Sequence, residues 1–172
     1  MNYYDLVKLR HSVRKYNADK PIDKEVLLRI LNAARLAPSA HNNQPWTFVV
    51  ISSTKVLAEV HQAYEREWLK QAPMVIAIKG RKSEAWHRKY DEYQSLETDL
   101  TIAMDHLIMA ATQEGLGTCW IAAFEPEKLA SALKLEEDEV VYAITPLGYP
   151  AEEPLVAKEK TRKELNDMVD WL

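Results

Sequence analysis

Two arginines and a hydroxyl group lie close together near the amino terminus, in Arg10-His11-Ser12-Val13-Arg14. Alternate side chains of an extended chain point the same way, so an extended backbone would bring Arg10, Ser12 and Arg14 to one side. The forked donors of arginine suit a phosphate group. The segment therefore indicates an anion site, and a solvated basic stretch is the alternative that the same residues allow.

A second polar segment reads PSAHNNQPW and covers residues 38–46. Its amide side chains each carry both a hydrogen-bond donor and an acceptor. Such groups suit recognition of the edge of a heterocycle or of its sugar-like chain. Turn-rich connections favour the same residue types, so a plain turn remains the alternative.

A basic pair, Arg162 and Lys163, follows Thr161 near the carboxyl end. Thr161 and Glu164 have the spacing of a capping box, which predicts a final helix beginning here. Cations at a helix N-terminus are disfavoured by about 0.3–1 kcal/mol, so the pair favours a bound anion at that helix end. A chance surface pair is the alternative. The predicted helix turns four apolar residues inward, namely Leu165, Met168, Val169 and Leu172.

Other chemistries find little support in the sequence. Gly115 and Gly117 follow a helical pattern and lack a third glycine, which argues against a Rossmann dinucleotide site. The five histidines show no metal-binding spacing, and a zinc cage needs more than one cysteine. Cys119 lies in an apolar stretch and is interpreted as a core residue rather than a nucleophile. No metal is expected.

Composition indicates one compact domain over residues 1–172, with 47% hydrophobic and 28% charged residues. The net charge of −4 argues against a nucleic-acid partner, and the scattered basic residues argue against a membrane patch. The longest apolar runs are too short to span a bilayer, and no signal sequence is recognisable. With a single cysteine, a cytoplasmic location is the default expectation.

Hydrophobic periodicity predicts alternating helices and strands around one sheet, a mixed α and β fold. Asp23 is expected to cap the second helix, and Gly115 to end the longest one. The predicted helices cover residues 2–10, 23–37, 54–64, 96–111, 126–133 and the carboxyl end, and the strands cover 46–51, 74–78, 118–124 and 140–147. Residues 80–93 are expected to form a loop or short helix, and 151–160 an exposed connection.

Taken in order, these segments resemble the FMN-dependent nitroreductase family in its short form. The resemblance covers nearly the whole chain. It rests on RHSVR, on PSAHNNQPW after a helix, on GLGTCWIAAF after the long helix, on PLGYP at a strand end and on the final basic pair. PSAHNNQPW is specific, whereas RHSVR alone is weak.

The resemblance implies an α+β fold, a three-layer α/β/α sandwich with a central mixed, mostly antiparallel sheet. It also implies an intertwined homodimer with two FMN molecules at the subunit interface, in which the long helix packs against its twin. The implied activity is hydride transfer from NAD(P)H to a small acceptor such as a nitroaromatic or quinone, with a ping-pong mechanism. Free flavin, an enone or a halogenated phenol are alternative acceptors.

The resemblance also implies roles for individual residues. Arg14 is expected near the pyrimidine edge, where a fixed cation would stabilise the reduced flavin. The residues expected to hold the phosphate are Arg10, Ser12, Arg162 and Lys163, with His11 in the same segment. Those expected to reach a flavin bound mainly by the other subunit are Pro38, Ser39, Ala40, Asn42 and Gln44, and the backbone expected to face the ring is that of Ile121, Ala122 and Ala123.

Two departures from the family pattern affect these expectations. Many members carry a glycine pair where this chain has Ala122-Ala123, and the two methyl groups would narrow the flavin pocket. That leaves room for a flavin-storing or flavin-sensing protein with little turnover, and a flavin-free helical interaction module is a third possibility. The second departure is the segment 80–93, which is short for the segment that would cover the pocket. Its three aromatic residues are still expected to form a lid, namely Trp86, Tyr90 and Tyr93.

Overall fold

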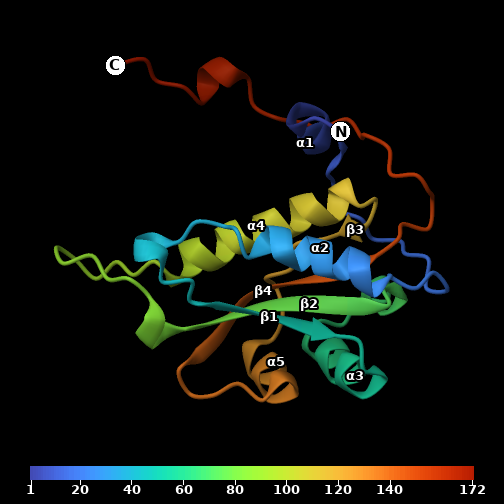
Figure 1. Ribbon diagram of the computed structural model, residues 1–172, viewed down its shortest axis with the longest axis horizontal. Coiled ribbons are helices and arrows are strands. Elements are labelled where there is room, and N and C mark those ends of the chain that lie inside the picture. Colours follow the sequence, from blue (N-terminus) through green and yellow to red (C-terminus); the bar gives the residue numbers. More distant parts are fainter.

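The computed structural model describes all 172 residues and has three layers (Figure 1). Helices α2 (Lys24–Ala34) and α4 (Leu96–Gln113) cover one face of the sheet. Helices α3 (Thr54–Ala63) and α5 (Pro126–Leu133) cover the other. Helix α1 (Tyr3–Leu9) packs on the outside of α4. The predicted α/β/α sandwich is confirmed.

The sheet contains four strands in the order β1-β2-β4-β3. Every neighbouring pair is antiparallel, and one parallel bridge joins Ser12 to Thr118 at the β3 edge. The sheet is therefore mostly antiparallel, as predicted. The strand bounds are β1 Trp46–Ile51, β2 Met74–Arg81, β3 Gly117–Thr118 and β4 Glu139–Gly148.

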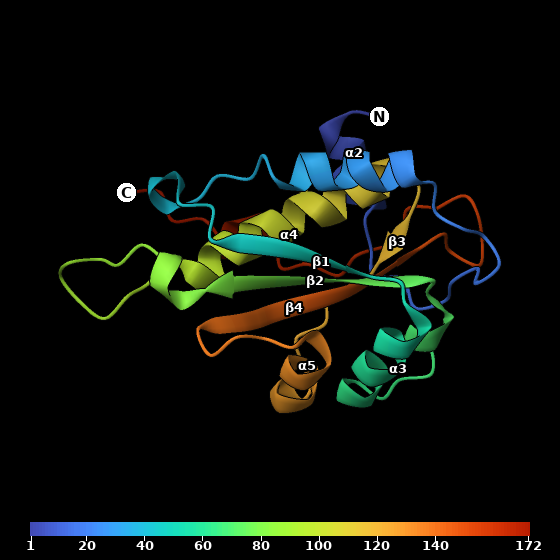
Figure 2. The ribbon, with the colours of Figure 1, turned by 60° about the horizontal axis from the view of Figure 1, so that its bottom comes forward.

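The central strand β2 separates two apolar cores. Figure 2 shows the helices that cover them on the two sides of the sheet. Residues 74–78 are all buried because helices cover both faces of this strand. Ile76 and Ile78 face the larger core under α2 and α4, whereas Val75 and Ala77 face the smaller core over α3 and α5. The uninterrupted apolar run of β2 thus follows from its central place between two helical layers.

Most predicted elements are confirmed with small shifts at their ends. Asn2 caps α1, accepting the Asp5 N–H at 2.9 Å through its side-chain oxygen. Asp23 occupies the N-cap position of α2 as predicted, but its side chain accepts no capping hydrogen bond. Gly115 follows α4 with a φ of 79°, a left-handed conformation that favours glycine. None of the helices combines the length and apolar character needed to cross a bilayer.

The predicted strand over residues 118–124 is wrong. Strand β3 ends at Thr118, and beyond it only Ile121 pairs with the sheet, through an antiparallel bridge to Ile144. Trp120 is 39% exposed, and the two alanines after Ile121 are exposed as well. The chain is leaving the sheet for α5 here, so its apolar residues do not form a continuous strand.

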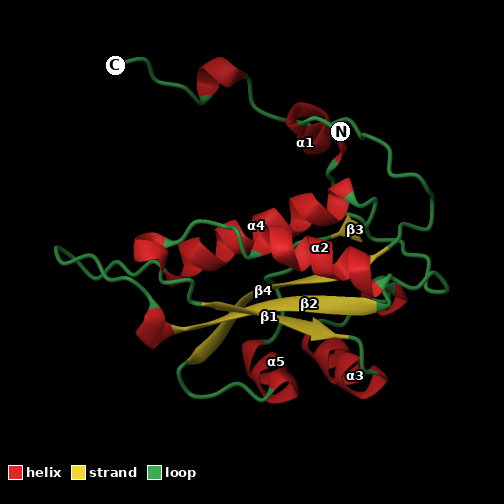
Figure 3. Ribbon diagram, in the orientation of Figure 1, coloured by secondary structure: helices red, strands yellow, loops and turns green.

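The predicted carboxyl-terminal helix is also wrong. Only a 3-10 turn over Leu165–Asp167 forms, and Thr161 caps no helix (Figure 3). Leu165 and Met168 are 69% and 57% exposed, and Trp171 is 90% exposed. A short amphipathic helix gains its stability from packing, and the tail runs past α1 away from the sheet, where its own protomer offers no apolar surface to it (Figure 1).

Candidate functional site

The segment 10–14 is extended, as the sequence predicted. The buried Val13 donates its N–H to the Thr118 carbonyl at 2.8 Å, while Ser12 and Arg14 are exposed on the other side of the chain. Gly117 permits this close approach, because a Cβ there would lie 2.7 Å from the Cβ of Val13. The β3 edge therefore fixes the direction of the two exposed side chains.

Tyr16 is buried and stabilises the same segment through two hydrogen bonds. Its hydroxyl donates to the Val13 carbonyl at 2.7 Å, and burial raises the pKa of Tyr16 well above its usual value. Its N–H donates to Oε1 of Gln71 at 3.3 Å. The guanidinium of Arg14 lies 5.8 Å from the centre of the Trp68 ring, a cation–π distance. Trp68 and Gln71 are contacts of this segment that sequence reasoning did not identify.

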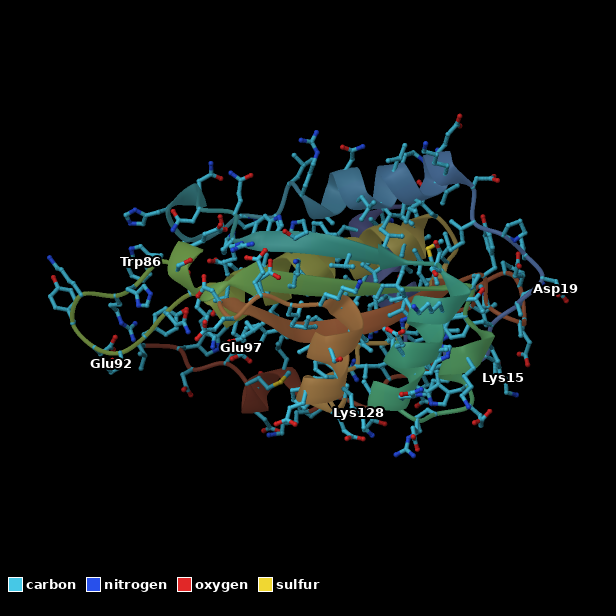
Figure 4. The ribbon with its side chains drawn as sticks, turned by 90° about the horizontal axis from the view of Figure 1, so that it is seen from below. Lys15, Asp19, Trp86, Glu92, Glu97 and Lys128 are labelled. Atoms are coloured by element: carbon cyan, nitrogen blue, oxygen red, sulfur yellow. The ribbon has the colours of Figure 1, made fainter.

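A groove of about 490 Å³ runs along this segment. One wall carries His11, Ser12 and Arg14, and the other is formed by residues 150 and 152–156 with Lys158. Figure 4 places Lys15, a further residue of this wall, at one end of the molecule, and Trp86 and Glu92 at the opposite end.

Cations from both ends of the chain meet beside this groove. The ammonium group of Lys160 donates a hydrogen bond to the carbonyl of Val7 in α1. Burial and then the neighbouring charges of Arg10 and Arg162 lower the pKa of Lys160. Arg10, Lys160 and Arg162 take part in none of the ion pairs of the chain.

Arg10 and Arg162, which the resemblance assigns to one site, both lie near Lys160, and sequence reasoning missed Lys160. Lys160 could have been found from its spacing. It lies two positions before Arg162, and an extended chain places both side chains on one side. The argument from a helix N-terminus was wrong because no helix begins at Thr161. Lys163 is exposed and forms no ion pair.

The amide-rich turn adopts an unusual backbone. His41, Asn42 and Gln44 have φ values of 52°, 58° and 51°, in the left-handed region. Ser39 Oγ accepts the N–H of Gln44 at 3.0 Å, and the Gln44 side chain donates to the Asn42 carbonyl at 3.1 Å. Ser39 and Gln44 thus shape the turn itself, whereas the Pro38 and Asn42 side chains are exposed.

Ala40 is tied to the start of α4. Its N–H donates to Oδ1 of Asp99 at 2.9 Å, and Asp99 is only 2% exposed. The backbone N–H of Ala40 is therefore occupied and is not available to a ligand. Asp99 was not among the predicted residues, although a carboxylate between Leu96 and Leu100 on a helix face that is otherwise apolar was a visible signal.

The remaining predicted backbone segment is only partly free. Ile121 exchanges both backbone hydrogen bonds with Ile144, each at 3.0 Å, so its N–H is occupied. Ala122 and Ala123 are exposed and donate no backbone hydrogen bond. Any contact to a ligand ring through backbone N–H groups must come from these two alanines.

The segment after α1, which carries Arg10 and Ser12, and the amide-rich turn lie at opposite ends of α4 (Figure 1). The turn is bonded to Asp99 in the first turn of this helix, whereas Ser12 pairs with Thr118 beyond its last residue. An 18-residue helix is about 27 Å long. One protomer therefore does not bring the two predicted halves of the site together.

The sequence and structure identify the family. The nitroreductase family model matches residues 7–64 and 54–149. A nitroreductase family protein of Clostridium difficile 630 superimposes with a TM-score of 0.90 at 30% identity, covering 99% of this chain and 98% of its own. The chain belongs to the nitroreductase family.

Two further relatives carry informative names. A protein of Archaeoglobus fulgidus, provisionally named NADH dehydrogenase/NAD(P)H nitroreductase, is 31% identical over 153 residues, covering 86% of this chain and 85% of its own. A solved structure described as an oxidoreductase containing FMN has a TM-score of 0.80 at 25% identity and covers 99% of this chain and 91% of its own.

Proposed function

We propose that the chain is an FMN-dependent oxidoreductase that takes hydride from NAD(P)H and passes it to a small acceptor such as a nitroaromatic or a quinone. We also take residues 1–172 as one FMN-binding domain, because both cores pack on the same sheet. The observation that carries the proposal is the cluster of Arg10, Lys160 and Arg162, three cations without an acidic partner.

A phosphate group fits this cluster well. Like charges held together lower the affinity of Lys160 for its proton, and a dianion among them would reverse that effect. Charge-assisted hydrogen bonds from arginine to phosphate are among the strongest in proteins. In this proposal Arg10, Lys160 and Arg162 hold the FMN phosphate, with Ser12 and Lys163 as further donors and His11 beside them in the groove wall.

The groove next to the cluster is the proposed place of the flavin ring. When bound, FMN supplies the two-electron chemistry that links hydride donor and acceptor. Arg14 lines the groove next to Val13, whose backbone is bonded to Thr118, and its guanidinium lies over the ring of Trp68. A cation held in advance where negative charge develops lowers the free energy of the reduced state. The free N–H groups of Ala122 and Ala123 are candidate donors to the ring.

We further propose that the active form is an intertwined homodimer with FMN at the interface. The distance between the two halves of the site supports this, because a second protomer can bring its turn, with Pro38, Ser39, Ala40, Asn42 and Gln44, to the cations of the first. An apolar groove of about 420 Å³ lies between α1, α2 and α4, which gives α4 a surface for its twin. The exposed apolar tail offers further surface to a partner.

A single open face of the ring would serve NAD(P)H and the acceptor in turn, which gives the proposed ping-pong kinetics. The acceptor class and the cytoplasmic location are parts of the same proposal. A flavin-storing protein would bind FMN in the same groove without this turnover.

The absorbance spectrum of the purified full chain tests the proposal. We expect a yellow protein whose visible flavin bands bleach on anaerobic addition of NAD(P)H and return when an acceptor is added. A yellow protein that NAD(P)H does not bleach would instead support flavin storage. A colourless protein that takes up no added FMN would contradict both. Sedimentation at twice the chain mass of 19.8 kDa is the expected sign of the dimer.

A further inference from the structure

The segment after β2 forms a small hairpin beside the amide-rich turn. The Ser95 N–H donates to the Trp86 carbonyl at 2.9 Å, and the Arg88 N–H donates to the Tyr93 carbonyl at 3.0 Å. We call residues 85–95 the aromatic hairpin. The predicted loop or short helix over residues 80–93 is confirmed for most of this stretch, which has a 3-10 turn over Lys82–Glu84 and then a loop that one bridge between His87 and Gln94 closes; only the start, Gly80 and Arg81, belongs to β2 instead.

Asp99 is bonded to both segments. Oδ1 accepts the Ala40 N–H of the turn at 2.9 Å, and Oδ2 accepts the Ser95 hydroxyl at 2.7 Å. The Ser95 hydroxyl in turn accepts the N–H of Trp86 at 3.2 Å. One buried carboxylate therefore connects the turn to the base of the hairpin, each oxygen serving one of them.

Asp99 has no cation within ion-pairing distance, so its buried charge depends on these two bonds and on the start of α4. A carboxylate in the first turn of a helix is favoured by the helix dipole. Leaving either donor or the carboxylate unpaired in a buried place destabilises the folded chain. The arrangement is thus stable only when the turn and the hairpin are both in place.

The two segments also touch through aromatic rings. His41 of the turn stacks on Trp86 with ring centres 5.7 Å apart and an angle of 21° between the planes. Tyr93 meets Trp86 edge to face at 6.4 Å. The Asn43 side chain donates to the Glu84 carbonyl at 2.9 Å, a third connection just before the hairpin. Together these contacts make a continuous aromatic surface from two separate parts of the sequence.

We propose that Asp99 is a positioning residue that joins the amide-rich turn and the aromatic hairpin into one unit, and that this unit is the wall against which a flat aromatic acceptor stacks. This inference rests on the proposed function, because the turn is the part of the flavin site that the partner protomer supplies. Asp99 itself touches neither flavin nor acceptor.

Hydrogen exchange of the full chain as purified tests the coupling. Asp99→Ala should speed exchange at least tenfold in residues 38–45 and in residues 85–95, and leave β2 unchanged. Ser95→Ala should loosen the hairpin more than the turn, because Oδ1 of Asp99 keeps its bond to Ala40. Asp99→Asn keeps one acceptor oxygen and should loosen one of the two segments, which gives a reading if the alanine variant does not fold. The matched control is Glu97→Gln, an exposed charge in the same helical turn, and it should change neither segment.

Kinetics test the role of the wall. With Ser95→Ala, kcat/KM for a nitrobenzene-type acceptor should fall about tenfold, while that for ferricyanide, which needs no stacking wall, should stay within twofold. Equal losses for both acceptors would overturn the proposed wall. The coupling would be overturned if Asp99→Ala left hydrogen exchange unchanged in either the turn or the hairpin. It would also be overturned if exchange in β2 rose as much as exchange in these two segments. A colourless protein that takes up no FMN would contradict the proposed function and therefore the proposed wall. The exchange data would still show whether Asp99 couples the two segments.

Discussion

The two ends of α4 treat their polar groups in opposite ways. At its start, Ser39, Ser95 and Asp99 accept hydrogen bonds from groups of the turn and the hairpin within one protomer. Beyond its far end, Arg10 and Arg162 lie near enough to Lys160 to lower its pKa, and none of the three forms an ion pair. The first region is held by bonds within one protomer, whereas the second gathers like charges, which an anion would stabilise under the proposed function.

This difference separates two kinds of functional residue. The turn and the hairpin form a preorganised surface, whose changes should alter shape and specificity. The cation cluster is the proposed binding site, whose changes should alter affinity while leaving the fold intact. Each of the following substitutions tests one side of that distinction.

The largest effect is expected from removing two cations. Arg10→Ala with Arg162→Ala should weaken FMN binding a hundredfold or more, because each charge-assisted hydrogen bond contributes about 1.5–3 kcal/mol. Fluorescence titration of apoprotein with FMN measures the affinity. Lys8→Ala removes an exposed cation of α1 and serves as the control. Full flavin retention by the double variant would show that the phosphate lies elsewhere.

The second effect concerns the start of β1. A Cβ on Gly80 would lie 2.5 Å from the Pro45 carbonyl oxygen and 2.7 Å from Cδ1 of Leu96. Gly80→Ala should therefore lower the free energy of unfolding by about 1–3 kcal/mol, as overpacking does. Urea denaturation measures it, with Thr47→Ala on the exposed side of β1 as the control. A stability equal to that of the parent would mean that Pro45 and the turn before it are not held by this contact.

A smaller, kinetic effect is expected at Arg14. Arg14→Ala should slow flavin reduction by NAD(P)H about tenfold, a loss of about 1.4 kcal/mol of stabilisation, and should weaken FMN binding less than that. Anaerobic stopped flow gives the reduction rate, and Lys24→Ala in α2 is the control. Equal reduction rates in variant and parent would remove Arg14 from the mechanism.

The smallest effect is expected for Lys160 in the apoprotein. Its pKa is lower in the folded chain than its ordinary value of 10.5, so the protonated form disfavours folding at neutral pH. That cost falls as the pH rises through the folded pKa and is gone above the ordinary value. Lys160→Met should therefore not lower the apoprotein Tm at pH 7. Inorganic phosphate should raise the Tm of the parent more than that of the variant, and a reversed order would contradict the cluster.

Much of the fold could be predicted because local patterns and packing agree. The apolar run of β2 and the long periodic face of α4 identified the sheet and its main helix. The tail misled the prediction because its apolar residues, such as Leu165 and Trp171, have no surface to pack on within one protomer. A helical pattern does not reveal whether such a surface exists.

Sequence reasoning can propose site residues whose side chains would act directly, but not those that act through others. Arg10, Ser12 and Arg14 could be proposed from their types and spacing. Asp99 could not be assigned a role, because its bond to Ala40 joins residues that are distant in sequence. Lys160 could not be assigned a role either, because its place beside α1 depends on the path that the tail takes.

A mixing experiment tests the central claim most directly. One variant lacks the cations through Arg10→Ala and Arg162→Ala, and the other lacks the turn amides through Asn42→Ala and Gln44→Ala. In a dimer of one chain of each kind, one site combines the intact cations of one protomer with the intact turn of its partner. We predict that each variant alone binds little FMN and that mixed dimers recover one FMN per dimer. No recovery on mixing, in dimers shown to contain both chains, would contradict a site shared between protomers.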